Sequence, residues 1–405
     1  MEPSKGPKGP LAGFRIIDLS SVVLGPLATQ ILGDYGADII KVESLEGDLI
    51  RSNGVSRHAG MSSIYLAINR SKRSLAIDLK NPDGVAAVRR LVGTADAVVH
   101  NMRMEAVERL GFGYEDCAAI KPDIVYCVAT GFGQDGPDAP RPAFDDVIQA
   151  GCGLVSLSEV YAERPDFMAS LIADKTVGMA LANAVLAGLL HRARTGEGQM
   201  IEVPMLETMA SFTLAEHMGG MCFEPREGPA GYQRILKGGR RPMQTKDGWL
   251  AVLPYTGDHW AAFLADVGRD DLVPTAADRT ARAKHIHELY AVMAEAMVLR
   301  TTDDWMKTCD RLDIPAARVY ALDDLPDHPH LKAVDFFVER DHPTEGRIRE
   351  TRPPTKFSKS PATIGRPAPL HGEDSRQLLR EAGLGDSDIS AMVKSGVVKV
   401  AGETR

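Results

Sequence analysis

The chain has 405 residues, of which 44% are hydrophobic and 25% are charged, and its formal net charge at pH 7 is −8. This balance is typical of soluble globular proteins, and the length predicts two domains or one domain with a large insertion. The negative charge and the lack of a basic run argue against nucleic acid as the main partner. The five cysteines form no CxxC pair and the eleven histidines show no metal-binding spacing, so we expect no metal site.

The sequence offers no targeting or membrane signal. The first ten residues lack the apolar stretch of a secretory signal, so we expect a cytoplasmic location. The most apolar run, residues 179–190, contains Asn183 and ends at His191. It is shorter than the roughly 18 to 20 residues that cross a bilayer, so no membrane association is predicted.

The first third of the chain alternates between apolar runs and helical segments. Runs that are apolar throughout indicate strands buried on both faces of a parallel sheet. A helix is predicted to begin after Asn81, since asparagine is a good N-cap and Pro82 suits the first helical turn. We therefore expect a doubly wound α/β domain. Its predicted strands are residues 14–19, 38–43, 75–79, 96–102 and 124–130, and its other helices include 26–35 and 106–110.

A long helix rich in small residues is predicted from Asp174 to Arg194. Gly196 and Gly198 supply its stop signal, and residues 199–205 then indicate another buried strand.

The texture of the sequence changes beyond Phe223, where polar and turn-forming residues dominate. Residues 245–255 combine an Asp-Gly turn with an apolar run, as in a hairpin. We place a second, smaller domain at residues 226–330, including a helix at 301–312 with Thr302 as its cap. The large domain then comprises residues 1–225 and 331–405.

Asp174 stands at the start of the predicted long helix. An aspartate there is most simply an N-cap, and the spacing alone favours that interpretation. The positive end of the helix dipole also favours the ionised carboxylate and keeps it available for attack. A carboxylate is a weak nucleophile, but it is adequate toward an acyl thioester, because the anhydride that forms has a comparable energy. Capping and nucleophilic attack are therefore both open.

The segment Gly131–Gly136 matches the GxGxxG pattern of dinucleotide-binding loops. Three prolines follow at once, so the helix that should bind the pyrophosphate cannot begin there. We interpret the segment as a loop at the carboxyl edge of the sheet, where ligands of open α/β sheets bind. A nicotinamide-dependent oxidoreductase is disfavoured, and a Ser-His-Asp hydrolase is unsupported because no GxSxG elbow occurs.

Basic residues near the ends of the predicted strands form another candidate group. Each one by itself is most simply a solvated surface charge. Several cations at the ends of parallel strands, however, suit the phosphates of a nucleotide-like ligand, and arginine offers bidentate contacts. The members of this group are Lys41, Arg51, Lys72, Arg73 and Arg109.

Five segments carry a family resemblance, among them NRSKRSLAIDLKNPDG at residues 69–84 and the closing segment 353–384. With these segments the chain resembles the class III CoA-transferase family, which includes formyl-CoA transferases, carnitine CoA-transferases and α-methylacyl-CoA racemases. The likeness covers nearly the whole sequence. The other three segments are residues 11–51, 111–137 and 173–203.

The resemblance implies a Rossmann-like large domain built from both ends of the chain, a smaller inserted α+β domain and an interlocked homodimer. It implies that coenzyme A moves from an acyl-CoA donor to a free carboxylic acid through aspartyl anhydride and aspartyl-CoA intermediates. Coenzyme A is then a substrate, and no permanently bound cofactor is expected. Asp174 matches the family's catalytic aspartate, and the residues placed near the CoA moiety are Lys72, Arg73, Asn101 and Arg109.

Two departures from the family patterns bear on the reaction. Formyl-CoA transferases have a glutamine where this chain has Val23, so oxalate and formate are poorly supported as substrates. The racemases have a proton-transferring histidine in a triplet that here reads Ala143, Phe144 and Asp145. Phenylalanine cannot carry a proton, so transfer is favoured over racemase-type proton exchange. A non-catalytic CoA binder is a further alternative, and the acid pair is left open by the sequence.

Overall fold

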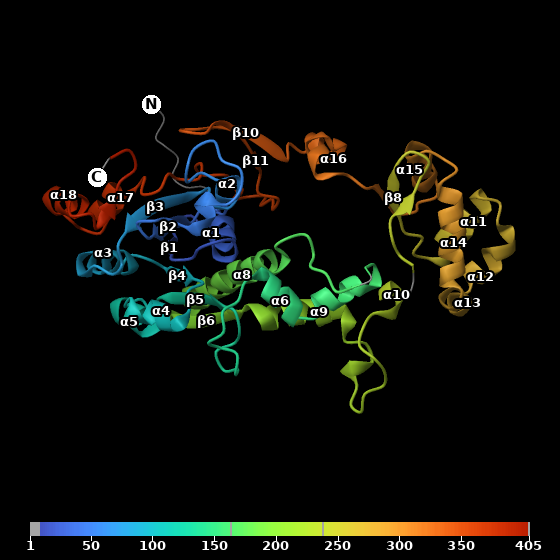
Figure 1. Ribbon diagram of the computed structural model, residues 1–405, viewed down its shortest axis with the longest axis horizontal. Coiled ribbons are helices and arrows are strands. Elements are labelled where there is room, and N and C mark those ends of the chain that lie inside the picture. Colours follow the sequence, from blue (N-terminus) through green and yellow to red (C-terminus); the bar gives the residue numbers. More distant parts are fainter. Residues whose placement is uncertain (1–8, 163, 237–238, 404–405) are drawn as a thin grey trace. The chain divides into compact units, whose positions relative to one another are not determined.

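The computed structural model describes residues 9–162, 164–236 and 239–403 (Figure 1). The chain divides into two compact units, residues 1–213 with 334–405 and residues 214–333. The domain boundaries expected at 226 and 330 fall within the second unit. The first ten residues, for which no secretory signal was expected, lie largely outside the described residues.

The first unit is built on a sheet that has seven strands within the described residues. β12 (Val398–Lys399) pairs antiparallel with its neighbour, and the other strands are parallel. The parallel strands are β1 (Arg15–Asp18), β2 (Asp38–Glu43), β3 (Lys72–Ile77), β4 (Ala97–His100), β5 (Val125–Thr130) and β6 (Gln199–Pro204). In space the order is β12-β3-β2-β1-β4-β5-β6, so the order reverses between β1 and β4.

Helices cover both faces of this sheet, because its Ile- and Val-rich strands are apolar on both sides. One face packs against α1 (Leu24–Asp34) and α8 (Ile172–Thr195). The opposite face packs against α3 (Pro82–Val92), α5 (Tyr114–Ile120), α17 (Ser375–Glu381) and α18 (Asp386–Lys394). The C-terminal α17 thus lies beside the N-terminal β3, as Figure 1 shows. The predicted α/β fold with a mostly parallel central sheet is confirmed.

Shorter elements connect these layers in the first unit. They are α2 (Ser63–Ile68), α4 (Met104–Arg109), α6 (Asp145–Gly151), α7 (Leu154–Leu157), α9 (Met205–His217, which runs into the second unit), β10 (Phe337–His342) and β11 (Gly346–Thr351).

α8 is a core helix, and its small residues allow close packing. A Cβ atom on Gly178 would lie 2.7 Å from the carbonyl oxygen of Leu24, and one on Gly188 would lie 2.6 Å from Val125. By length and composition alone, this 24-residue helix is apolar enough to cross a membrane, so the expectation that no segment qualifies is wrong. Its packing on α1, β5 and β6 explains that apolar character without a membrane.

The second unit combines a small sheet with a helical layer. The predicted Asp-Gly hairpin is present, since β7 (Met243–Gln244) pairs antiparallel with β8 (Trp249–Val252), which pairs with β9 (Ala316–Arg318). Trp260, Phe263 and Trp305 lie in its buried core. Its helices are α10 (Gln233–Leu236), α11 (Gly257–Asp266), α12 (Val273–Ala277), α13 (Arg279–Lys284), α14 (Ile286–Met297), α15 (Thr302–Arg311) and α16 (Pro329–Ala333).

Two of the sequence-predicted helix starts can be compared with the structure. The side chain of Asn81 accepts a hydrogen bond from the backbone N–H of Asp83 at 2.9 Å, as expected of an N-cap. The cap of α15 is Thr301, whose hydroxyl accepts from the N–H of Asp304, so the prediction of Thr302 is wrong by one residue.

A buried ionic cluster lies at the carboxyl end of β1, whose last residue is Asp18. Lys72 Nζ is 3.0 Å from Asp18 Oδ2 and Lys41 Nζ is 2.8 Å from Asp48 Oδ2, and all four side chains are buried. Burial opposes the charge of Asp18, but Lys72, Lys41 and two hydroxyl donors outweigh it and lower the pKa of Asp18. For Lys72 burial is the larger effect and lowers the pKa to about 8. The cluster joins β1, β2 and β3, which carry Asp18, Lys41 and Lys72, respectively.

Replacing Lys72 by Met should destabilise the protein by about 3 kcal/mol, because it leaves the buried Asp18 carboxylate without its closest cation. Thermal unfolding followed by circular dichroism measures the effect. Lys80→Met, at an exposed lysine just after β3, is the matched control and should unfold within a degree or two of wild type. Equal stability of the two variants would contradict a structural role for Lys72.

Candidate active site

A cavity of about 480 Å³ opens within the first unit at the carboxyl edge of the sheet. Its walls come from the loops that follow β1, β4 and β5, together with the first turn of α8. The order of the strands reverses at the same place, between β1 and β4. Open α/β sheets bind their ligands at such switch points. The lining residues include Ser21, Val22, Asn101, Arg103, Gln134, Arg141, Phe144 and Asp174.

Asp174 is the third residue of α8 and is not its cap. The N-cap is Leu171, whose side chain makes no capping hydrogen bond. The backbone N–H of Asp174 instead donates to Asp145 Oδ1 at 2.9 Å. Asp145 belongs to α6. A carboxylate from another helix therefore accepts the hydrogen bond of an N–H group that an N-cap side chain would ordinarily bind. Among the described residues, no hydrogen bond engages the Asp174 carboxylate, which lines the cavity.

Gln149 holds Asp145 in this position. Its Nε2 donates to Asp145 Oδ2 at 2.5 Å and to the carbonyl oxygen of Ser170 at 3.2 Å. Its Oε1 accepts from the backbone N–H of Met168 at 3.0 Å. Asp145 and Gln149 are both buried. These bonds tie the chain segment that precedes α8 to α6, and so fix where the first turn of α8 lies.

The environment of Asp174 raises the pKa of its carboxyl to about 6. Burial is the main cause, and the nearby carboxylates Asp145 and Asp146 add to it. This direction is opposite to the one expected from the helix dipole, because burial, together with the like charges of Asp145 and Asp146, opposes the ionised carboxylate. The group is still largely ionised at neutral pH, and it is more basic than an ordinary aspartate.

The loop after β1 is held in a strained conformation beside the cavity. Val22 has a φ of 69°, which is rare for a β-branched residue, and its N–H donates to Asp48 Oδ1 at 3.0 Å. Asn101 pins the neighbouring Ser21, accepting from its N–H and donating to its carbonyl oxygen, both at 2.9 Å. Because Asp48 belongs to the buried ionic cluster, this cluster helps to hold the loop after β1 in place.

The structure brings together only some of the predicted site residues. Asp174 and Asn101 both line the cavity. Lys72 is fully buried and bonded to Asp18, Asn69 and the carbonyl oxygen of Pro26, so its ammonium does not reach the cavity.

The other predicted cations also lie away from the cavity lining. Arg73 pairs with Asp38 at 2.6 Å, at the amino end of β2, and with Glu381 at 2.7 Å. Arg109 is exposed in the last turn of α4. Lys41 and Arg51 are buried in ion pairs with acidic residues.

Four residues of this region were not singled out as site residues from the sequence. Arg103 is the N-cap residue of α4, three residues after the end of β4, and a closer count from that strand end would have found it. Arg141 lines the cavity from the proline-rich loop and pairs with Asp138 at 3.1 Å. Gln134 lies in the Gly131–Gly136 loop, which is at the carboxyl edge as expected. Asp145 was marked in the sequence only as the last residue of the triplet at 143–145, and its positioning role depends on contact between two helices.

The next helix after the Gly131–Gly136 loop is α6, which begins only at Asp145. The dinucleotide interpretation is therefore not supported, as the prolines predicted. Within the described ranges, no group of three or more His, Cys, Asp or Glu side chains could hold a metal ion.

The sequence profile of CoA-transferase family III matches residues 11–375. Succinyl-CoA:glutarate CoA-transferase of Mus musculus is 31% identical over 397 residues, which cover 96% of this chain and 90% of that protein. Succinate–glutarate CoA-transferase of Agrobacterium fabrum is 30% identical over 390 residues, which cover 92% of this chain and 96% of that protein.

Solved structures agree with these relatives. The crystal structure of Rv3272 from Mycobacterium tuberculosis has a TM-score of 0.80 at 28% identity and covers 92% of this chain and 99% of its own. A CAIB/BAIF family protein from Brucella suis also has a TM-score of 0.80, at 27% identity, covering 93% of this chain and 100% of its own. Because the profile and the relatives span nearly the whole sequence, this chain belongs to CoA-transferase family III.

Proposed function

We propose that this family III CoA-transferase moves coenzyme A from an acyl-CoA donor to a free carboxylic acid through covalent intermediates on Asp174. The observation that carries the proposal is the uncommitted Asp174 carboxylate at the wall of a cavity on the carboxyl edge of the sheet. Its raised pKa, about 6, makes it a better nucleophile than an ordinary aspartate while leaving it ionised at neutral pH.

The reaction proceeds by four acyl transfers. The Asp174 carboxylate attacks the thioester carbonyl, which gives a mixed anhydride and the CoA thiolate. The thiolate attacks the aspartyl carbonyl, which releases the donor acid and forms an aspartyl-CoA thioester. The incoming carboxylate attacks that thioester and gives a second anhydride and the thiolate. The thiolate then attacks the substrate carbonyl, so that the new acyl-CoA leaves and the Asp174 carboxylate is restored.

Neighbouring residues supply charge and position. Arg103 is exposed at the cavity wall and has no ion pair within the described part of the chain, so it suits a CoA phosphate or a substrate carboxylate. Asn101 keeps the strained loop after β1 in place and holds one side of the cavity open. Direct contacts of Arg73, Arg109 and Lys72 with CoA stay predictions from the family resemblance, and the buried position of Lys72 favours an indirect role.

We propose succinyl-CoA as the acyl donor. Several relatives are named for it or for succinate, including the mouse enzyme, the Agrobacterium fabrum enzyme and the succinyl-CoA:mesaconate CoA-transferase of Haloarcula marismortui. Another relative, from Clostridioides difficile, is an (R)-2-hydroxy-4-methylpentanoate CoA-transferase, so the family also handles monocarboxylic acids.

Racemase-type proton exchange is the weaker candidate. It needs two proton-transfer groups on opposite sides of a substrate Cα. Phe144 lines the cavity where the racemases have their histidine, and none of the described lining residues is a histidine. A binder without turnover is also weaker, since an inert binder has no need of a carboxylate freed from its capping role.

We further propose that the enzyme works as a homodimer, interlocked as in the family it resembles. Large apolar side chains are exposed on α8, β6 and α9 of the first unit, which suits an interface between copies. These side chains are Met179, Leu190, Met200 and Phe212.

The strand order β3-β2-β1-β4-β5-β6 supports the Rossmann-like assignment. The cytoplasmic location stays a prediction.

Incubation with succinyl-CoA should leave coenzyme A attached to Asp174, detected by mass spectrometry of the peptide that contains this residue. Hydroxylamine should remove the adduct, because it cleaves thioesters. Asp174→Asn is the matched variant and should form no adduct. The proposal fails if no donor in a panel of acyl-CoA compounds leaves an adduct, or if Asp174→Asn still exchanges CoA.

The rate of adduct formation should fall as the pH drops below about 6, because only the ionised Asp174 attacks. In Asp145→Asn the midpoint should move to lower pH, since a like charge is removed. The limiting rate should fall by roughly tenfold to a hundredfold, since the amide nitrogen cannot accept a hydrogen bond and one of the two bonds that fix the first turn of α8, from Asp174 N–H or from Gln149, is lost. Single-turnover adduct formation between about pH 4 and pH 8, two units on either side of the midpoint near 6, measures both effects.

Asp146→Asn is the matched control for this pH series. It removes a nearby exposed charge that makes no hydrogen bond to α8 within the described residues. Its midpoint should move less than that of Asp145→Asn, and its limiting rate should stay close to wild type. Identical behaviour of the two variants would refute the positioning role of Asp145.

Light scattering coupled to gel filtration should give a mass of twice the 43.8 kDa of the chain. A double change of Met179 and Leu190 to Glu should reduce the dimer fraction, because it buries charges at the interface. Leu322→Glu, at an exposed leucine of the second unit, should leave the mass unchanged. A wild-type mass of a single chain at micromolar concentration would contradict the dimer.

A further inference from the structure

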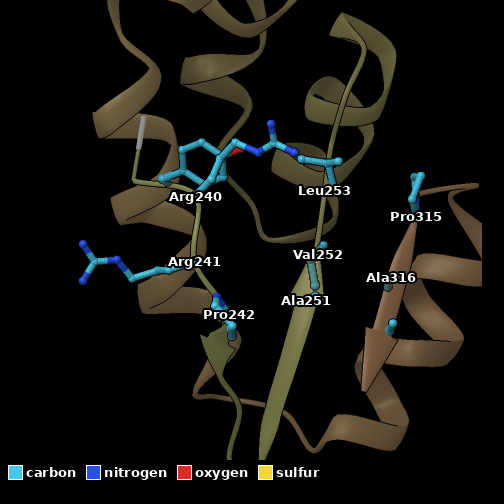
Figure 2. Close-up of a pocket in the computed structure, with 10 residues that line it drawn as sticks. Arg240, Arg241, Pro242, Ala251, Val252, Leu253, Pro315 and Ala316 are labelled. Carbon is cyan, nitrogen blue, oxygen red and sulfur yellow. The ribbon is translucent and has the colours of Figure 1, made fainter. Parts of the chain in front are cut away.

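Each acyl transfer proposed above passes through a tetrahedral intermediate, whose oxygen carries a negative charge. Hydrogen-bond donors that are already in place stabilise such an oxyanion best, because they need no reorganisation during the reaction. The cavity that contains Asp174 is lined by residues of the first unit alone. The cavity of the second unit, drawn in Figure 2, has Arg240 and Arg241 in its lining but no carboxylate among the described residues. The first-unit cavity is therefore the place where such a donor is needed.

Two carboxylates hold the loop that follows β5. The backbone N–H of Gly133 donates to Glu207 Oε1 at 2.9 Å. The backbone N–H of Gln134 donates to Glu202 Oε1 at 3.0 Å. A Cβ atom on Gly133 would lie 2.6 Å from Glu207 Oε1, so the turn and the carboxylate are closely packed. Backbone N–H groups of glycine-rich loops often bind anions, but here the chain's own carboxylates occupy both of these groups, and the loop is fixed.

The side-chain amide of Gln134 is held as well. Its Nε2 donates to the carbonyl oxygen of Phe132, a buried residue, at 3.0 Å. Because a carbonyl oxygen only accepts hydrogen bonds, this contact fixes which end of the amide is nitrogen. Gln134 lines the cavity, and its second N–H has no acceptor within the described part of the chain. It therefore offers a donor that is oriented in advance.

Gln134 and Asp174 flank the same crossover of the chain. α8 lies between β5 and β6 in the sequence and packs extensively on both strands. Asp174 is in the first turn of α8 and Gln134 follows the end of β5, so both are at the carboxyl edge of the sheet. Asn101, another amide in the lining, follows β4 and is bonded to Ser21 through both its oxygen and its nitrogen. Of these two amides, Gln134 is the one that follows a strand on which α8 packs extensively.

The surroundings of Asp174 favour a neutral donor over a cation. In the intermediate the attacked carbon is bonded to an oxygen of Asp174, so a cation at the oxyanion would also lie close to the resting carboxylate and lower its pKa. The pKa of Asp174 is instead raised, first by burial and then by Asp145 and Asp146, and no cation among the described residues counteracts this. Arg103 and Arg141 line the cavity, but an amide fits the place beside Asp174 better.

We propose that the side-chain amide of Gln134 donates a hydrogen bond to the oxyanion of the tetrahedral intermediates at Asp174 and is a further catalytic residue. The proposal rests on the CoA transfer proposed above, and it names the group that stabilises the developing charge in that reaction. Glu207 acts through Gln134 and is a positioning residue, because it holds the loop that carries the amide.

The first transfer shows how the bond is used. An oxygen of Asp174 bonds to the thioester carbon, and the electron pair of the C=O bond moves to the carbonyl oxygen. The Nε2–H of Gln134 donates to that oxygen and keeps its proton. The C=O bond then re-forms as the C–S bond breaks, and the sulfur leaves with the electron pair as the CoA thiolate.

The test uses the full-length enzyme with Gln134 changed to Leu, which keeps the approximate size of the side chain and removes the donor. Gln377→Leu, at an exposed glutamine of α17 outside the cavity lining, is the matched control. Glu207→Leu releases the loop, and Glu207→Gln keeps an oxygen that accepts the N–H of Gly133. Single-turnover formation of the CoA adduct, followed against pH and against succinyl-CoA concentration, gives the limiting rate, the midpoint and the apparent affinity.

Gln134→Leu should lower the limiting rate by roughly a hundredfold to a thousandfold, as expected for the loss of one oxyanion donor. The apparent affinity should change by less than about threefold, because the bond is made mainly in the transition state. The midpoint near pH 6 should stay in place, since the amide carries no charge. Glu207→Leu should lower the limiting rate by roughly tenfold to a hundredfold, again at unchanged affinity and midpoint. Glu207→Gln and Gln377→Leu should stay close to wild type.

An unchanged limiting rate in Gln134→Leu would overturn the proposal. A loss of affinity as large as the loss of rate, or a displaced midpoint, would overturn it as well, because either result would show that Gln134 serves binding or the structure of the site.

A second measurement needs no turnover. Succinyl-CoA with carbon-13 at the thioester carbonyl is bound to Asp174→Asn, and the carbonyl stretch is recorded by isotope-edited infrared difference spectroscopy. Donation by Gln134 polarises the carbonyl, so its band should lie at lower frequency than in the double variant Asp174→Asn, Gln134→Leu. Equal bands, or no bound ligand, would refute the donor even if the wild-type enzyme formed no adduct. Adduct formation by the wild type tests the proposed transfer by itself, so the two failures are separate results.

Discussion

The hydrogen bond from the backbone N–H of Asp174 to Asp145 Oδ1 is the contact on which the catalytic proposal depends. An aspartate in the first turn of a helix ordinarily satisfies free N–H groups of that turn. Here a carboxylate from α6 does so instead, and the Asp174 side chain is left for chemistry. Burial is the main cause of the raised pKa of Asp174, and the charge of Asp145 adds to it, so the contact that positions the nucleophile also contributes to this shift.

The fold could largely be predicted, because its signals are local. The Asn81-Pro82 helix start, the Asp-Gly turn of the β7–β8 hairpin and the apolar strands β1 to β5 each follow from short-range preferences and burial. β6 is a strand as predicted, but it lies at the edge of the sheet and only its Val203 is buried, so the prediction of a buried strand is wrong there. The exceptions are also local in scale. Thr301 rather than Thr302 caps α15, since either threonine suits the cap and only the backbone distinguishes them. α8 is apolar enough for a membrane because it packs between α1 and the sheet.

The site could be predicted only in part, because the charge of a residue does not indicate whether its side chain is buried or lines a cavity. Lys72 is the first residue of β3, and Arg103 follows β4 of the same sheet. Lys72 nevertheless pairs with Asp18 inside the protein, whereas Arg103 lines the cavity. Sequence spacing cannot predict this difference in burial, since it depends on which residues pack around each side chain in the folded protein. The family triplet marked Asp145 in the sequence, but its positioning role could not be predicted. Its value lies in the meeting of α6 with the first turn of α8, which no pattern within either helix reveals.

A crystal structure of the enzyme after brief exposure to succinyl-CoA would test the central claim most directly. We expect continuous electron density between the Asp174 carboxyl carbon and the CoA sulfur, with Asp145 still within hydrogen-bond distance of the Asp174 N–H. Density for intact acyl-CoA beside an Asp174 side chain that has turned back to cap α8 would contradict the account.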